Sequence, residues 1–488
     1  MRLGFQHSYS ALPGRFHVRV APTAVANPRV VVFNTPLAAE LGLDPGLLEA
    51  EAASLLSGNR LPEDAEPIAM AYAGHQFGVF VPSLGDGRAV LLGELRARDG
   101  SLRDLQLKGA GLTPFSRNGD GRAVLGPMLR EYLISEAMHA LGVPTSRSLA
   151  VVTTGEPVYR DGALPGAVLA RVAASHMRVG TFQYFSARND IDSLRYLLDY
   201  LIARHYPAAH ESAVPALAVL QEVAQRQCRL IADWMRLGFI HGVMNTDNMA
   251  LSGETLDYGP CAFMDEYDPK TVFSSIDHAG RYAYANQPVI AQWNLARFAE
   301  ALLPLIDSDP TKAVSLASAV LEPFIAQFDT HFLSAMTTKL GLSTTLEGDV
   351  ELVRHLLATM QRSHADFTLT FRRLAAVAED PADVAPLREL FNADAELDAW
   401  LSQWRQRLTK DPQTAAERAH GMRAANPAFI PRNHRVQAAL DAAEGGDYQP
   451  FRKLLAILQR PYDDQPAVSE YSLPPQPAER VLQTFCGT

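Results

Sequence analysis

The chain has 488 residues, 47% of them hydrophobic, and a formal net charge of −10, so it can bury a large core and hold two or three domains. The acidic balance excludes a nucleic-acid coat, which needs a basic surface, and no apolar stretch approaches the roughly 20 residues that span a bilayer. Three cysteines, Cys228, Cys261 and Cys486, lie far apart and give neither a disulfide framework nor metal-ligand spacing, which indicates a reducing compartment.

The N-terminal segment has the composition of a transit peptide, but its pattern favours folded protein. The first acidic residue is Glu40, and four arginines precede it, as in organellar targeting segments. Prolines at positions 13, 22, 28 and 36 would interrupt a long amphipathic helix. Residues Val30 to Phe33 have the composition of a buried strand. We therefore expect this segment to belong to the fold and the protein to be cytoplasmic.

Between about Tyr72 and Arg178 the pattern favours β-structure interrupted by one helix. Pro127 suits the first turn of a helix whose apolar residues recur at helical spacing until Gly142 and Pro144 end it. Strands are predicted on both sides of an Asp-Gly turn and again after the helix, at 89–92, 105–108, 149–152 and 167–170. Strands, one helix and more strands form the plan of the small lobe of a protein kinase.

Beyond Asp190 the pattern turns helical. Amphipathic runs joined by prolines are predicted at 194–205, 216–237, 293–305, 314–340, 350–378 and 436–458. The tail from Pro461 to Thr488 is expected to be an extended strap. This order predicts an α+β protein with a protein-kinase-like two-lobed fold and a helical C-terminal extension. We place a β-rich, nucleotide-binding N-lobe at residues 1–185, and the C-lobe with the helical extension and extended tail at 186–488.

The most informative segment runs from His241 to Asn248 and is followed by an Asp-Tyr-Gly that begins at Asp257. Kinase-like phosphotransferases carry His-x-Asp-x-x-x-x-Asn and then Asp-Phe-Gly; the first Asp handles the substrate hydroxyl, and the Asn and second Asp hold the metal. Here the position of the first Asp is Val243, which cannot accept a proton. A carboxylate stands instead at Asp247, so the metal end of the motif is retained and the acceptor end is rebuilt.

Two alternatives accompany this interpretation. Asp247 and Asn248 could form an Asx turn that ends a helix. Asp265 competes with Asp257 as the second metal ligand.

Glycine-rich turns and a lysine strand are candidates for nucleotide contacts. The turns at 74–78 and 84–88 precede the strand that ends in Lys108, and glycines let a backbone approach phosphates closely. Ordinary hairpin turns are the alternative. A lysine in this place holds phosphates and pairs with a helix glutamate. Glu131 and Glu136 compete for that pairing, and we prefer Glu131 because it lies nearer to Lys108 in sequence.

Two arginines are the next candidates. Arg171 and Arg178 are expected at the mouth of a nucleotide site, where guanidinium groups could grip phosphates bidentately; surface ion pairs are the alternative. The loop at 118–122 is either a solvated loop or a nest that faces the nucleotide. The histidines show no metal-binding motif, so three of them are expected to be structural: His75, His176 and His210.

Taken together, these segments resemble the selenoprotein O family (SelO, also YdiU) of kinase-fold pseudokinases, over essentially the whole length. The motifs that carry the resemblance are Ser8–Pro13, Ala73–Gly78, Gln106–Gly109, Arg130–Met138, His241–Met249, Asn426-Pro427 and Pro431–His434. Several long and unusual motifs in the right order make the resemblance specific.

The resemblance implies a protein adenylyltransferase that transfers AMP from ATP to Ser, Thr or Tyr hydroxyls of protein substrates and releases pyrophosphate. It implies a nucleotide that is inverted relative to a kinase, so that the α-phosphate faces the acceptor. Asp247 is then the base, and Asn248 and Asp257 hold Mg²⁺ or Mn²⁺. The residues placed around ATP are Gly85, Gly87, Arg88, Lys108, Asp120, Gly121, Arg171, Arg178 and Asp257, with Glu131 behind Lys108.

Family members also carry a redox-active residue near the C-terminus, and Cys486 matches it. In some relatives this residue bridges to a cysteine shortly after the metal motif. The corresponding stretch here, residues 270–275, contains no cysteine, so a latch through that partner is not expected. We expect protein substrates, with redox proteins as candidates, and a monomer without nucleic-acid or membrane partners. The choices of ATP or UTP and of Mg²⁺ or Mn²⁺ stay open.

Two other functions also stay open: a conventional protein or small-molecule kinase in which Asp247 replaces the missing loop aspartate, and a nucleotide-binding pseudokinase scaffold. Val243 argues against the kinase. The retained Lys108, Asn248 and Asp257 argue against the scaffold, because a scaffold needs no metal ligands.

Overall fold

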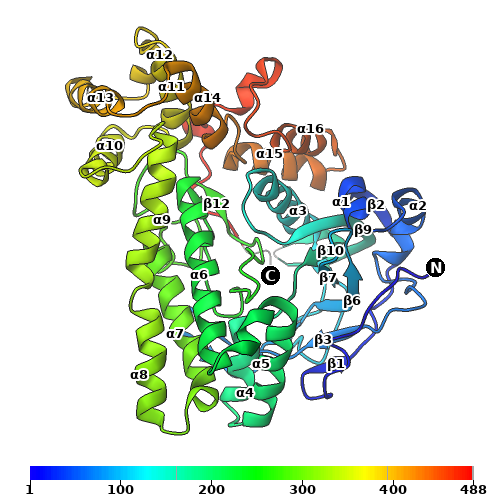
Figure 1. Cartoon of the computed structure of the whole chain (residues 1–488). Helices are drawn as coiled ribbons and strands as arrows, with labels where there is room; N and C mark the ends of the chain where they lie inside the picture. The colour runs from blue at the N-terminus through cyan, green and yellow to red at the C-terminus, as the bar shows by residue number, and fades with distance from the viewer. Residues whose placement is uncertain (161, 393, 486–488) are drawn as a thin grey trace.

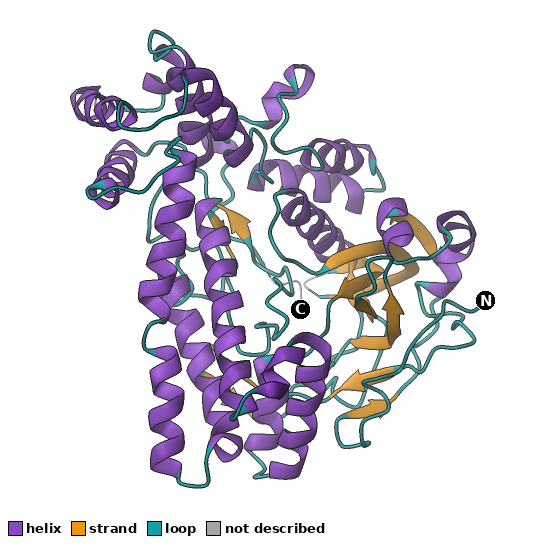
Figure 2. Cartoon of the chain, in the orientation of Figure 1, coloured by secondary structure: helices purple, strands orange, loops and turns teal. Residues whose placement is uncertain are grey.

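The computed structural model describes residues 1–160, 162–392 and 394–485. It combines an antiparallel sheet, whose strands do not follow the order of the chain, with a large helical part. Figures 1 and 2 show the sheet on one side of the molecule, the long helices beside it, and further helices above both. The protein is therefore of the α+β class, with a helical C-terminal part, as predicted. No helix among the described residues is long and apolar enough to cross a membrane.

The main sheet is antiparallel throughout, and its strand order is β1-β3-β6-β7-β10-β9-β2, with β8 paired to β10. The strands are β1 (His17–Arg19), β2 (Arg29–Phe33), β3 (Ile68–Met70), β6 (Ala89–Arg96), β7 (Leu102–Lys108), β8 (Ala123–Val124), β9 (Arg147–Tyr159) and β10 (Ala163–Ala173). The four strands predicted between residues 89 and 170 are confirmed, and the N-terminal segment supplies β1 and β2 as folded protein.

Strand β7 has two different faces. Leu105 and Leu107 belong to a core that the sheet forms with α1 (Thr35–Glu40) and α2 (Pro45–Leu55). Side chains alternate across a strand, so Asp104, Gln106 and Lys108 project from the opposite face, and all three are buried. One strand therefore presents three polar side chains in a row beneath the sheet.

Helix α3 (Leu125–Ala140) lies against that polar face of the sheet, with Pro127 in its first turn as predicted. Its apolar side chains join the main core. From the other side, α15 (Asn433–Glu444) and α16 (Gln449–Leu458) pack on α3, where the rings of Tyr132 and Phe451 lie 6.1 Å apart. The Tyr462 hydroxyl also donates to the Leu141 carbonyl, at 3.0 Å. Helix α3 is thus enclosed between the sheet and the C-terminal helices (Figure 1).

All the predicted helical runs are helical, but three of these each contain two helices, and further helices that were not predicted occur at 179–186 and between 385 and 425. The breaks come at residues that disfavour or restart a helix: Pro323, His364 with φ of +53°, and Gly446 with φ of +92°. The helices are α4 (Val179–Ser186), α5 (Ile191–His205), α6 (Pro215–Arg236), α7 (Gln287–Ile306), α8 (Pro310–Leu321), α9 (Phe324–Lys339), α10 (Asp349–Ser363), α11 (Phe367–Glu379), α12 (Ala385–Arg388), α13 (Asp394–Leu408) and α14 (Ala415–Ala425), before α15 and α16.

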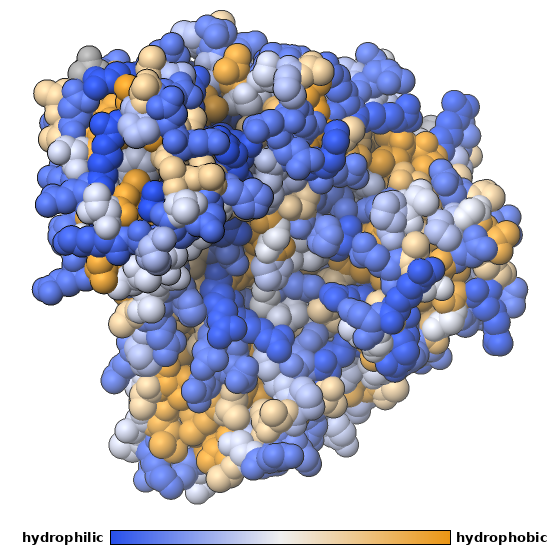
Figure 3. Space-filling view, turned by 45° about the horizontal axis from the view of Figure 1, so that its top comes forward, coloured by the Kyte–Doolittle hydropathy of each residue, from blue (hydrophilic) through white to orange (hydrophobic). Residues whose placement is uncertain are grey.

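Most of the face in Figure 3 is hydrophilic, and apolar residues gather at its lower left, where the long helices lie. Val289 on α7 and Val314 on α8 are exposed, and both line a hollow of about 660 Å³ between these helices. Helices α7 and α8 therefore do not close on each other completely.

Two small hairpins position the loops of the site. Strands β11 (Phe239–Ile240) and β12 (Ala262–Phe263) pair with each other and bracket the loop of residues 241–261. Strands β4 (Gly74–Gln76) and β5 (Val79–Val81) form a second hairpin. The tail contains short 3₁₀ turns rather than one extended strap, and then returns to the 273–275 segment, where the Thr484 amide donates to the Phe273 carbonyl at 2.7 Å. Cys486 lies outside the described residues.

Candidate active site

The loop after β11 is held from both sides. His241 is buried, stacks on Trp234 with 5.3 Å between ring centroids, and contacts the Leu256 carbonyl at 3.1 Å through Nε2. Gly242 has φ of +81°, and a Cβ there would lie 2.8 Å from the Pro260 carbonyl oxygen. Only glycine fits this turn without strain. These contacts fix the conformation of the backbone at the start of the loop that carries Asp247 and Asn248.

The β4–β5 hairpin lies across this loop. The His75 amide donates to Thr246 Oγ1 at 2.7 Å, and the Phe77 amide donates to Asn245 Oδ1 at 3.0 Å. A Cβ on Gly74 would lie 2.5 Å from Asp247 Oδ1. The glycine-rich turn at 74–78, considered above as a phosphate-approach turn, therefore contacts the loop of Asp247, and its first glycine makes room for that carboxylate.

Asp247 is almost completely buried, at 9% exposure. Its Oδ2 accepts from Gln76 Nε2 at 3.3 Å, while its Oδ1 has no hydrogen-bond partner among the described residues. Burial raises the pKa of Asp247 to about 6, although the hydrogen bond from Gln76 and the charge of Arg178 act in the opposite direction. The carboxylate can therefore take up a proton near neutral pH, and one of its oxygens is available for that proton.

Asp257 faces several cations. It has φ of +69° and keeps 34% of its side chain exposed, and it contacts Lys108 as well as Arg171, the latter at 3.8 Å. Burial opposes ionisation, but Lys108 and Arg171, with Arg88, outweigh it and hold the pKa of Asp257 well below its usual range. Asp257 is therefore a carboxylate at neutral pH, and its only partly covered oxygens suit a cation.

Asn248 uses its amide nitrogen within the loop. Its Nδ2 donates to the Val243 carbonyl at 3.1 Å, which leaves the amide oxygen as the group that it can offer. One carboxylate and one amide oxygen suit Mg²⁺ or Mn²⁺ carried by a polyphosphate, which supplies further oxygen ligands. No group of three or more His, Cys, Asp or Glu side chains able to hold a metal occurs in the described part of the chain. The donor set thus fits a nucleotide-bound ion.

The competitor Asp265 is committed elsewhere. Its Oδ1 lies 2.7 Å from Arg432 Nη1, and the same guanidinium binds Asp366 at 2.6 Å. Burial raises the pKa of Asp265 despite this partner. Asp265 therefore belongs to a buried ionic cluster that joins β12 to the C-terminal helices.

Lys108 and the two helix glutamates have different partners. Lys108 Nζ lies 2.6 Å from Glu131 Oε2, whereas Glu136 pairs with Arg147 at 2.8 Å. Glu131 also receives Arg171 Nη1, at 3.2 Å. The structure thus places Glu131, the residue preferred from sequence, between two cations of the site.

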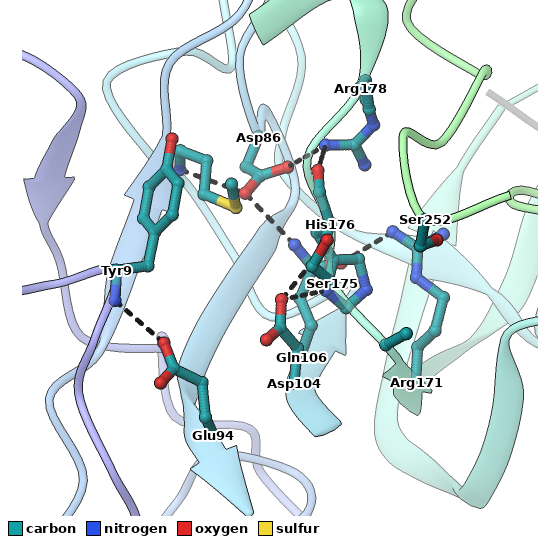
Figure 4. A network of polar contacts seen from close by, with 12 residues as sticks. Tyr9, Asp86, Glu94, Asp104, Gln106, Arg171, Ser175, His176, Arg178 and Ser252 are labelled. Atoms are coloured by element: carbon teal, nitrogen blue, oxygen red, sulfur yellow. Dashed lines mark hydrogen bonds and ion pairs between the residues drawn. The ribbon is translucent and has the colours of Figure 1, made fainter. Parts of the chain in front are cut away.

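Arg171 and Arg178 are buried, with 3% and 4% exposure. Their ion pairs, with Glu131 and Asp86, are therefore buried, which contradicts the alternative of surface ion pairs. Arg178 donates to the His176 carbonyl at 3.1 Å, and its guanidinium lies 4.4 Å from the centroid of the Tyr72 ring. Figure 4 shows both arginines in one polar network. Strand β10 and the N-terminus of α4 hold them inside the protein, where their charges are screened little by water.

The turn at 84–88 is tightly packed. A Cβ on Gly85 would lie 2.2 Å from the Phe115 ring, and one on Gly87 would lie 2.9 Å from the Phe115 carbonyl oxygen. The amides of Gly85 and Gly87 already donate to the carbonyls of Tyr72 and Gly85. These glycines therefore allow a close approach of two segments, and their amides are occupied inside the protein. Arg88 lies near enough to Asp257 to lower its pKa.

Asp120 lies in an exposed stretch of its loop, whereas the next residue, Gly121, is buried. Asp120 pairs with Arg160 at 2.9 Å, which with the Arg122 amide lowers its pKa. Gly121 has φ of +69°, and a Cβ there would lie 2.2 Å from Gly111. The 118–122 loop is thus held by the ion pair to Arg160 and by its packing against Gly111.

Two of the three histidines expected to be structural are bonded within the fold. His75 Nδ1 contacts Gln183 at 2.8 Å and His176 Nδ1 contacts Asp104 at 3.1 Å, while His210 is exposed. Three further polar side chains contact the site residues although their sequence motifs predicted no role for them: Gln76, Asp86 and Gln106. The signal for Gln106 was present, because a strand that alternates Asp, Gln and Lys with leucines has one polar face.

Comparison with known proteins shows the class of this protein, which is a protein nucleotidyltransferase. A family model described as "Protein adenylyltransferase SelO" matches residues 1–459. The chain therefore belongs to the SelO family.

Similar proteins cover nearly the whole chain. A "Protein nucleotidyltransferase YdiU" of Bradyrhizobium sp. (strain BTAi1 / ATCC BAA-1182) is 63% identical over 486 residues, which are 99% of each chain. Proteins with the same description from Rhizobium johnstonii (strain DSM 114642 / LMG 32736 / 3841) and Rhizobium meliloti (strain 1021) are each 60% identical over 485 residues. These residues are 99% of this chain and 97% and 99% of the two relatives.

Proposed function

We propose that this enzyme transfers AMP from ATP to a hydroxyl side chain of a protein and releases pyrophosphate. The observation that carries the proposal is the position of the base. Val243 occupies the place of the usual kinase aspartate, while Asp247 has a buried, unpartnered Oδ1 and a pKa near 6. A general base is most effective when its pKa lies near the working pH.

In the proposed step, the acceptor oxygen attacks the α-phosphorus and its proton passes to Asp247 Oδ1. A new bond forms between the acceptor oxygen and the α-phosphorus. The bond from the α-phosphorus to the bridging oxygen breaks, and that oxygen leaves with the β- and γ-phosphates as pyrophosphate. Phosphoryl chemistry of this kind needs mainly positioning and charge neutralisation.

The cations suit a leaving pyrophosphate. Lys108 and Arg171 meet at Glu131, and Arg178 is buried as they are, so that all three charges have little solvent screening. We propose that they contact the β- and γ-phosphates of an inverted ATP, with Arg88 beside them. Gly85, Gly87, Asp120 and Gly121 are proposed to lie along the same nucleotide.

Asn248 and Asp257 are proposed to hold the nucleotide's Mg²⁺ or Mn²⁺, which when bound offsets phosphate charge. Lys108 binds Asp257 in this structure. When Asp257 engages a cation, Lys108 keeps Glu131 and can turn toward a phosphate. We also propose that residues 1–185 and 186–488 are the two lobes of a kinase-like fold, with the site between them.

The experiment that tests the function uses ATP labelled at the α- or the γ-phosphate, with a mixed protein extract as acceptor. The expected result is label from the α-position on protein, lost in Asp247→Asn. Label from the γ-position alone would identify a kinase, and protein that binds ATP but gains neither label would identify a scaffold.

A further inference from the structure

We infer that Asp86 and Gln106 are positioning residues that hold Arg178 and Arg171 in register for the polyphosphate. The inference deepens the proposed function and rests on it. Neither residue contacts the carboxylates of the metal motif, and both act through an arginine. Asp86 comes from the turn before β6, and Gln106 comes from the middle of β7.

The two residues connect the arginines by direct contacts, as Figure 4 shows. Arg178 Nη1 lies 3.7 Å from Asp86 Oδ1. Gln106 Nε2 donates to Asp86 Oδ2 at 3.1 Å, and Gln106 Oε1 accepts from Arg171 Nη2 at 2.6 Å. The chain of contacts therefore runs from Arg178 through Asp86 and Gln106 to Arg171.

The orientation of the Gln106 amide is fixed by its neighbours. Its nitrogen can only donate and its oxygen can only accept, and it faces a carboxylate on one side and a guanidinium on the other. Reversing the amide would break both contacts. Gln106 has 0% exposure and Asp86 2%, so water does not replace a lost partner without cost.

Asp86 is itself anchored to the sheet. The Met70 amide donates to its Oδ2 at 3.0 Å, and its backbone carbonyl accepts from Thr113 Oγ1 at 2.7 Å. The neighbours of Asp86, Gly85 and Gly87, have to be glycines because a Cβ at either position would clash with Phe115. Arg178 is thus held through Asp86 to strand β3, and Arg171 is held through Gln106 to strand β7.

The consequence is a fixed distance between two cations that have to meet two phosphates. The chain of contacts also continues beyond Arg171, because Arg171 contacts Glu131, and Glu131 contacts Lys108. Loss of the Gln106 amide would leave Asp86 and Arg171 each with one buried bond fewer and free to move apart. The expected effect is weaker nucleotide binding, although no residue proposed to contact the nucleotide is substituted.

The test is a double-mutant cycle on ATP binding, measured by calorimetry with ATP and Mg²⁺ and without a protein acceptor. Gln106→Leu, which keeps the side-chain volume, is expected to weaken binding about 10-fold. The same substitution in an Arg171→Ala/Arg178→Ala background is expected to change the affinity less than about twofold, because the residues it acts through are absent. In turnover, the loss should appear in KM for ATP and in kcat, and not in KM for the acceptor.

Asn426→Leu is the matched control, since Asn426 is an equally buried amide that donates to the Lys339 carbonyl in the C-terminal helices. It should lower thermal stability and leave ATP affinity unchanged. If Gln106→Leu does not fold, Gln106→Glu replaces it, because it keeps the acceptor for Arg171 and loses the donor to Asp86. ATP affinity within twofold of wild type in the variant that folds, or an equal loss in the background without the arginines, overturns the inference. A failure of AMP transfer alone would leave this binding result intact and would count against the proposed function instead.

Discussion

Removing Arg178 should have two separable effects, one on stability and one on transfer. Arg178→Ala leaves Asp86 buried without its counter-charge, and breaking a buried ion pair costs about 3–5 kcal/mol. The pair is long, at 3.7 Å, and Asp86 keeps donors from Met70 and Gln106. We therefore expect a loss of about 3 kcal/mol in the free energy of unfolding, at the lower end of that range. The burial of Arg178 rules out the small stability effect that a surface arginine would have.

The effect on transfer has a different origin. A charge-assisted bond to phosphate contributes about 1.5–3 kcal/mol, so the rate should fall roughly 10- to 150-fold. Adding Asp86→Asn to Arg178→Ala removes the unpaired carboxylate and should restore most of the stability. It should not restore transfer, because the cation is still absent.

The assay combines urea unfolding with initial rates of α-label transfer. Arg407→Ala provides the matched control, since Arg407 is a buried arginine that binds Asp349 at 2.6 Å in the C-terminal helices. It should lose stability by a similar amount and keep its transfer rate where the protein is folded. A double variant that recovers both stability and a rate within twofold of wild type would refute the role of Arg178 at the nucleotide.

Three further predictions follow from the site. Because the base must be ionised and burial raises the pKa of Asp247 to about 6, transfer should rise with pH through about 6 and fall about tenfold per pH unit below it; a flat profile from about pH 5 to 8 would exclude this base. Asp257→Asn should lose metal-dependent transfer and stay folded, since Lys108 keeps Glu131, whereas Asp265→Asn should lose stability through Arg432 and keep its response to metal; the reverse outcome would move the metal site. Cys486→Ser should leave ATP affinity nearly unchanged in calorimetry, and a large loss would show that the tail helps to build the nucleotide pocket.

The strands and the first helix were accessible from sequence because their signals are local. Pro127 and Gly142 mark the ends of α3, and alternating leucines mark β7. The short strands β4, β5, β11 and β12 were not, since two or three residues carry no period. Their pairing depends on segments far apart in the chain, such as the hairpin at 74–81 that lies over residues 245–247.

The site divides in the same way. A motif spacing pointed to Asp247, Asn248 and Asp257, and a short separation favoured Glu131 over Glu136. Spacing does not report burial, so Arg171 and Arg178 were expected near the surface although they lie inside. The hydrogen bond from Gln106 to Asp86 joins a strand to a turn and has no signature in either segment alone.

The enclosure of α3 has a consequence for how the enzyme can be controlled. In protein kinases a lysine–glutamate pair of this kind is governed by the position of its helix. Here α15 and α16 cover the outer side of α3, and an outward swing would first require these two helices to leave. This packing holds Glu131 beside Lys108, and we expect regulation to act on the other groups that approach the nucleotide or on access for the acceptor.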